Sequence, residues 1–138
     1  MGAVTLAESL GGLNGFFLHF LISVILVLVF SMLYVRITPY AEFKLIRAGK
    51  VAPAVSFSGA LLGFVIPLAS AIVHSVSLLD MLVWSGIAFV VQVLVFLLLR
   101  AFFDNLCRGI ADDKLAPAIF LGVLSLAAGI LNASCMTY

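Results

Sequence analysis

The sequence predicts an all-α integral membrane protein of four transmembrane helices, built as two tandem two-helix repeats in the same orientation. Of its 138 residues, 65% are hydrophobic and 9% are charged, and the mean hydropathy is +1.35. A soluble core of this size cannot hide so much apolar surface. Four uncharged runs, at 9–35, 51–79, 81–99 and 115–138, can each cross about 30 Å of hydrocarbon. A β-barrel is disfavoured, because these runs lack polar/apolar alternation.

The positive charges predict how the chain is threaded through the membrane. All seven Lys and Arg residues lie in two short segments: Arg36, Lys44, Arg47 and Lys50 in the first, and Arg100, Arg108 and Lys114 in the second. By the positive-inside rule, both segments are expected to be cytoplasmic, with both termini outside. A cleaved signal peptide is not expected, because residues 1–9 contain no cation.

The first repeat is expected to span residues 14–79, after an exposed outer lead-in at 1–13. Its first helix should run from about Asn14 to Val35, and because its stretch 21–35 has no polar stripe, it should be the most lipid-exposed helix. Pro39 then follows the membrane exit, and the segment 36–50 mixes apolar and charged side chains. This mixture predicts a short interfacial helix. It acts either as a generic anchor or as a specific site for a lipid or a protein.

The second helix of this repeat carries small and polar residues along one face. Gly59 and Gly63 form a GxxxG pair that lets another helix approach closely. Pro67 removes the donor that would bond the carbonyl of Gly63. Ser70 and His74 continue the same face. This pattern indicates either helix packing, which is common in membrane helices, or the broken helix with which a transporter binds an ion.

The second repeat is expected to span residues 80–138. Its first helix starts near Met81 and places Gln92 close to mid-membrane, where an amide must find partners. Gln92 therefore either joins helices or lines a polar pore. A second interfacial segment follows at 100–114, and the last helix carries Gly122, Gly129 and Asn132 along one face. Cys107 and Cys135 are predicted on opposite sides of the membrane, so they cannot form a disulfide.

The two halves align when the chain is shifted by 64 positions. This shift aligns Arg36 with Arg100. It also aligns the motif Lys-x-Ala-Pro-Ala that begins at Lys50 with the same motif that begins at Lys114. Two units that each cross the membrane twice share one orientation and are related by an axis along the membrane normal. The alignment fails where Pro67 falls on Leu131 and Leu68 on Asn132. We expect specialised function at those departures.

Three motifs resemble a known family. They are Arg-Ile-Thr-Pro-Tyr at 36–40, the Gly- and Pro-containing run at 54–68, and the terminal Asn-Ala-Ser-Cys-Met-Thr-Tyr at 132–138. They are similar to the domain-of-unknown-function 350 family, the small YjfL-like inner-membrane proteins of bacteria. The resemblance implies a bacterial inner-membrane protein with two tandem copies of the domain, and it brings no catalytic residue. Family members are often encoded near phage-shock-type membrane-maintenance proteins and ATP-grasp ligases. By association, the resemblance implies envelope stress, with a cytoplasmic membrane-stress partner, or polyamine chemistry.

The sequence favours a non-enzymatic role in the bilayer, with no cofactor, metal or nucleic acid. The first hypothesis is a homo-oligomeric permeation or transport module for a small solute or ion, with a polar path at Gln92, Asn132, Ser70 and His74. The alternative is a structural or regulatory subunit whose basic segments recruit a cytoplasmic partner or anionic lipid. A copper site at His19, His74, Cys135 and Met136 is disfavoured, because no close metal-ligand motif joins these residues.

Overall fold

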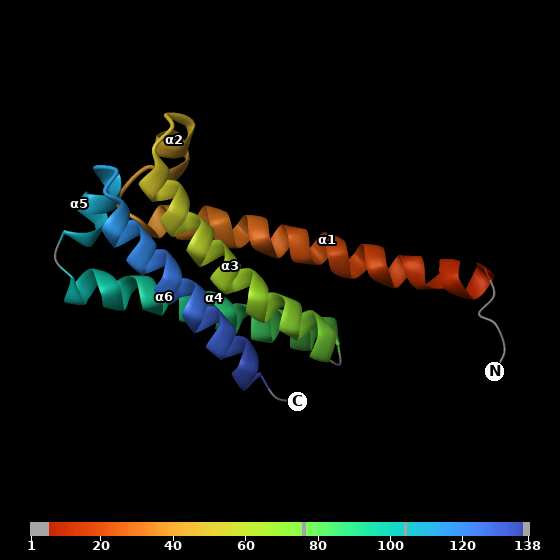
Figure 1. Cartoon of the computed structure of the whole chain (residues 1–138). Coiled ribbons are helices and arrows are strands. Elements are labelled where there is room, and N and C mark those ends of the chain that lie inside the picture. Colours follow the sequence, from red (N-terminus) through yellow and green to blue (C-terminus); the bar gives the residue numbers. More distant parts are fainter. Residues whose placement is uncertain (1–5, 76, 104, 137–138) are drawn as a thin grey trace.

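The computed structural model describes residues 6–75, 77–103 and 105–136, and its regular elements there are six α-helices (Figure 1). They are α1 Leu6–Ile37, α2 Glu42–Arg47, α3 Val51–His74, α4 Leu78–Phe102, α5 Leu106–Ala111 and α6 Leu115–Cys135. Four of them, α1, α3, α4 and α6, are long and apolar enough to cross a membrane. The predicted all-α, four-helix membrane protein is confirmed.

Helix α1 begins earlier than the sequence predicts. It starts at Leu6, before the expected start at Asn14, so residues 6–13 are helical; residues 1–5 lie outside the described chain. A helix gains one backbone hydrogen bond for each residue it adds, so a long helix extends into a neighbouring segment that contains helix formers such as Leu and Ala. As a result α1 projects well beyond the other helices (Figure 1).

Helices α3 and α6 form the centre of the bundle and run side by side in the same direction (Figure 1). Helix α4 packs against both of them, and α1 contacts α3 and α4 through the half of α1 nearer its C-terminus. Phe30 of α1 stacks on Phe64 of α3, with ring centroids 4.5 Å apart. Such offset aromatic contacts hold α1 at one end only.

The short helices α2 and α5 lie at one end of the bundle, which we call the basic end because the seven Lys and Arg residues belong to it (Figure 1). The opposite end, where α3 and α6 finish, is the far end. Both short helices close with the same turn: the N–H of Lys50 donates to Leu45 (3.1 Å), and that of Lys114 to Gly109 (2.9 Å). The tandem repeat stays a prediction, and the shift of 64 shared by these two turns supports it.

Candidate functional site

The closest helix contact in the bundle joins α3 to α6 through glycines. A Cβ added to Gly59 would lie 2.6 Å from the carbonyl carbon of Gly122, and one added to Gly129 would strike the backbone of Gly63. Such short distances leave room only for hydrogen, so the two backbones touch directly. Close Cα–H···O contacts of this kind stabilise helix pairs modestly. The predicted glycine face thus packs against α6 of the same chain.

Pro67 lies inside α3 without interrupting it. The residue is buried, and α3 continues from Val51 to His74. Because proline has no N–H, the carbonyl of Gly63 loses its donor within the helix. That carbonyl instead lies against Gly129 of α6, where any Cβ would collide with it. In this structure the freed carbonyl is therefore covered by a neighbouring helix.

Gln92 joins α4 to α6 near the middle of the bundle. Its side chain is 1% exposed, and its Nε2 donates to the carbonyl oxygen of Ser125 at 3.0 Å. Its Oε1 and the hydroxyl of Ser125 are both buried, and neither has a hydrogen-bond partner. Gln92 thus joins two helices, as the helix-packing interpretation predicts. Its Oε1 and the Ser125 hydroxyl, at the same depth, remain unsatisfied.

The other candidate polar residues lie toward the far end. The hydroxyl of Ser70 donates to the carbonyl of Ala133 at 3.5 Å and lies 3.4 Å from Nδ1 of His74. His74 is exposed, whereas Asn132 is partly buried and its Nδ2 has no hydrogen-bond partner. The structure therefore brings Ser70 and His74 together at this end, and it places Gln92 separately, deeper in the bundle.

A buried polar cluster at the basic end was missed by the sequence reasoning. It comprises Tyr34, Tyr40 and Glu42, whose side chains are 1%, 9% and 0% exposed. The two phenol oxygens and both carboxylate oxygens have no hydrogen-bond partner of good geometry, because the nearby Thr38 and Ser56 hydroxyls donate to the carbonyls of Val35 (2.9 Å) and Pro53 (3.1 Å). We call this group the Glu42 cluster. Four unsatisfied oxygens in one cluster are exceptional, because buried polar groups in proteins are nearly always bonded.

The chain reversal after α1 builds this cluster. The Thr38 hydroxyl donates to the carbonyl of Val35 at 2.9 Å, and Pro39 then stops the helix. The reversed chain packs α2 against α3 and buries the first residue of α2, Glu42. The ring of Tyr34 meanwhile packs near Phe57 of α3 and Phe96 of α4.

Burial dominates the electrostatics of the Glu42 cluster. Loss of hydration raises the pKa of Glu42 to about 7, and the nearby Thr38 hydroxyl opposes this rise. Burial, reinforced by the charge of Glu42, raises the pKa of Tyr40 far above its usual value. Burial also raises the pKa of Cys107 on α5. The charge of Arg100 opposes this rise, and that of Glu42 reinforces it. Glu42 therefore changes charge near neutral pH.

A sequence signal for this burial did exist. Glu42 precedes Leu45 and Ile46 by three and four residues, so it lies on their apolar face of α2. The cations of the same segment behave differently, since every Lys and Arg in the chain is exposed: Arg36, Lys44, Arg47, Lys50, Arg100, Arg108 and Lys114. Glu42 is thus the charged residue of its segment that faces inward.

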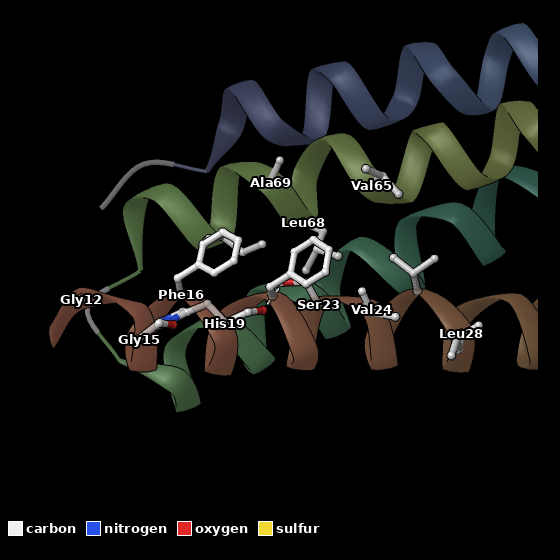
Figure 2. Close-up of a pocket in the computed structure, with 13 residues that line it drawn as sticks. Gly12, Gly15, Phe16, His19, Ser23, Val24, Leu28, Val65, Leu68 and Ala69 are labelled. Carbon is white, nitrogen blue, oxygen red and sulfur yellow. Dashed lines mark hydrogen bonds between the residues drawn. The ribbon is translucent and has the colours of Figure 1, made fainter. Parts of the chain in front are cut away.

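An apolar groove of about 750 Å³ opens between α1 and α3 where α1 diverges from the bundle (Figure 2). Phe16 and Phe20 of α1 and Leu68 of α3 are among its lining residues. Its polar side chains are engaged by their own helix: Nδ1 of His19 lies 2.8 Å from the Gly15 carbonyl, and the Ser23 hydroxyl donates to the His19 carbonyl at 2.6 Å. The groove therefore presents an apolar surface.

The described residues contain no group of three or more His, Cys, Asp and Glu side chains that could hold a metal ion. Cys107 and Cys135 are both free thiols and belong to opposite ends of the bundle, on α5 and at the end of α6. The structure thus keeps the two thiols apart, as the topology predicts.

Comparison with known proteins supports the family that the motifs predict. The chain is 43% identical over 129 residues to "UPF0719 inner membrane protein YjfL" of Escherichia coli (strain K12), covering 94% of this chain and 98% of that protein. The protein of that name from Escherichia coli O157:H7 matches equally. No solved structure matches significantly. The relative's name and the four apolar helices support a multi-pass inner-membrane location. A family model described as Domain of Unknown Function (DUF350) matches residues 6–136, and the chain belongs to that family.

Proposed function

We propose that the protein is a non-enzymatic permeation or transport-type module for a small cation, assembled as a homo-oligomer. The observation that carries this proposal is the set of buried polar atoms without hydrogen-bond partners. They occur at the basic end in the Glu42 cluster, near the middle at Gln92 and Ser125, and toward the far end at Asn132. Each such atom in a membrane interior is costly unless water or an ion satisfies it.

The chemistry of these atoms favours a cation over an anion. Oxygen atoms predominate among them, and Glu42 supplies a negative charge at one end. All seven Lys and Arg side chains are exposed at the basic end, so they do not line the bundle interior. An anion would find no positive charge along the buried positions, whereas a hydrated cation would find acceptors.

An assembly larger than one chain supplies the space that the bundle lacks. Within one chain the α3–α6 contact is closed by glycines, and Gln92 fills the space beside it. Helix α1 presents large exposed apolar side chains, including Phe16 and Phe20, along its outer half. Another copy that packs on α1 would bury this surface and enclose a path between subunits.

The test is a flux assay in liposomes that contain the purified protein. We expect the wild type to release K⁺ or Na⁺, and Gln92→Leu to reduce release at least tenfold, because an apolar constriction loses water. Ser134→Ala is the matched control, since Ser134 is exposed and bonds only to the Ile130 carbonyl of its own helix. Absence of flux from the wild type would refute the proposal.

A second function has its own observation in support. A pocket of about 580 Å³ at the basic end is lined by Arg108, Asp112 and Lys114, among others, and its cations suit a lipid phosphate or an acidic peptide. Under this alternative the protein is a membrane scaffold that recruits anionic lipid or a cytoplasmic partner. Native mass spectrometry tests it: retained anionic lipid that is lost in Arg108→Ala, with no flux from the wild type, would favour the scaffold.

A further inference from the structure

Among the described residues, no Lys or Arg side chain bonds to the buried carboxylate of the Glu42 cluster. The carboxylate is fully buried, and neither of its oxygens accepts a hydrogen bond of good geometry, because the nearby Thr38 hydroxyl donates to the Val35 carbonyl at 2.9 Å. Every Lys and Arg side chain is exposed, so none lies buried beside Glu42. A buried carboxylate without compensation is strongly destabilising, so it must hold a proton or a bound cation.

The groups around Glu42 define what kind of cation fits. Helix α1 contributes the phenol of Tyr34, and the loop before α2 contributes that of Tyr40. Helix α3 brings the hydroxyl of Ser56 close to Tyr40, and α5 brings Cys107, whose raised pKa keeps it a neutral thiol. Helix α4 contributes Arg100, which acts on Cys107 and is itself exposed.

Oxygen ligands of this kind select hard cations, and a single negative charge suits a single positive one. We propose that Glu42, Tyr34 and Tyr40 form a binding site for one alkali-metal cation, Na⁺ or K⁺, in competition with a proton on Glu42. The phenol oxygens act as ligands, and the carboxylate supplies the charge. A bound cation satisfies the buried oxygens and balances the charge of the carboxylate.

The other half of the chain shows that a carboxylate is not needed to build this part of the fold. Helix α5 begins at Leu106 as α2 begins at Glu42, 64 positions earlier, and Leu106 is also buried, at 5% exposed. The two helices end in the same hydrogen-bonded turn. An apolar residue therefore suffices at this position, and Glu42 marks the half in which a cation would bind.

The role of this site as the entry of a permeation path rests on the function proposed above. Cation binding at the site does not. Binding is measured on purified protein in detergent, and flux is measured in liposomes. Binding without flux would refute the permeation role and leave the site, and flux without binding would refute the site alone.

The experiment measures thermal unfolding of the full-length protein at pH 8.5 in NaCl, KCl or N-methyl-D-glucamine chloride at equal ionic strength. We expect Na⁺ or K⁺ to raise Tm by about 3 °C or more over N-methyl-D-glucamine, a bulky organic cation that should not reach a fully buried carboxylate. At pH 5.5 a proton occupies Glu42, so the difference should vanish. Glu42→Gln and Glu42→Leu should abolish it at both pH values.

Asp112→Asn is the matched control, because Asp112 is an exposed carboxylate at the same end and should leave the cation effect intact. Infrared difference spectroscopy gives a second readout that does not depend on stability. Exchange of N-methyl-D-glucamine for the alkali cation should shift the carboxylate stretch of the wild type and not of Glu42→Gln. If Glu42 titrates but neither readout distinguishes the cations, water alone fills the cluster and the proposal is wrong. A cation effect that persists in Glu42→Gln would equally overturn it.

Discussion

The carboxylate of Asp113 accepts a hydrogen bond of 2.8 Å from the backbone N–H of Ala52. This contact ties the turn before α6 to the first turn of α3, where the backbone N–H groups have no partner within the helix. Asp113 adopts a left-handed conformation with φ 63°, as Gly49 does at the corresponding turn with φ 87°. One side chain thus joins the starts of the two central helices.

Asp113→Ala should lower the free energy of unfolding by about 1–2 kcal/mol, because it removes a helix cap and places a Cβ-bearing residue without a compensating bond at positive φ. Asp113→Asn should retain most of the stability, since Asn keeps an acceptor and tolerates this conformation. Thermal unfolding in detergent measures both. Asp112→Ala, at the exposed neighbouring position, is the control and should change little. Equal loss in the Ala variants at 112 and 113 would contradict the capping role.

Gly63→Ala should destabilise the bundle, because the new Cβ would lie 2.6 Å from Nε2 of Gln92 and closer still to the Ser125 carbonyl. Gly86 of α4 is the matched control: it is exposed and has no atom within 4 Å of an added Cβ. Gly86→Ala should be neutral or stabilising by up to about 1 kcal/mol, from helix propensity alone.

Gly63→Leu should disrupt folding and assembly more strongly than Gly63→Ala. Thermal unfolding and native gels measure the effects. If the variants at Gly63 and Gly86 behave alike, the α3–α6 contact is not as close as described.

The stability of the protein should fall as pH rises from about 4.5 to about 7. The pKa of Glu42 is raised to about 7 in the folded state from a usual value of 4.5, so the folded state binds a proton that the unfolded state has released across this window. The loss should reach up to about 3 kcal/mol in a buffer without alkali cations. Thermal unfolding as a function of pH measures it. Glu42→Leu should remove this loss and exceed the wild type in stability at pH 8.5, because replacing an unpaired buried charge with an apolar side chain is favourable.

Membrane topology can be checked through the two free thiols. Cys135 is exposed at the end of α6, so a membrane-impermeant maleimide should label it in intact spheroplasts. Cys107 on α5 should be labelled only after permeabilisation, since the basic end is predicted to be cytoplasmic. Its raised pKa will slow the reaction, so Arg108→Cys in a background with Cys107→Ser and Cys135→Ser provides an exposed second probe. Labelling of this probe in intact spheroplasts would show that the predicted cytoplasmic placement of the basic end is wrong.

Composition and periodicity alone predicted the four membrane-crossing helices and the two short helices at 36–50 and 100–114. These features depend on local sequence, because lipid requires each crossing segment to satisfy its own backbone hydrogen bonds. The start of α1 was misplaced because it lies outside the strongly apolar stretch, where no such requirement fixes it. Where a helix begins within a weakly polar lead-in depends on a small balance of local propensities, which hydropathy does not measure.

Tertiary structure alone decided which surfaces meet. Sequence showed that Gly59 and Gly63 form a small face, but only the fold shows that Gly122 and Gly129 of α6 cover it. Likewise Glu42 reads as one more charge in a basic segment until α2 folds back on α3 and buries it beside Tyr34 and Tyr40. Hydropathy measures what each segment prefers by itself. The burial of a charge depends on residues distant in sequence, whose positions are fixed only when the helices pack.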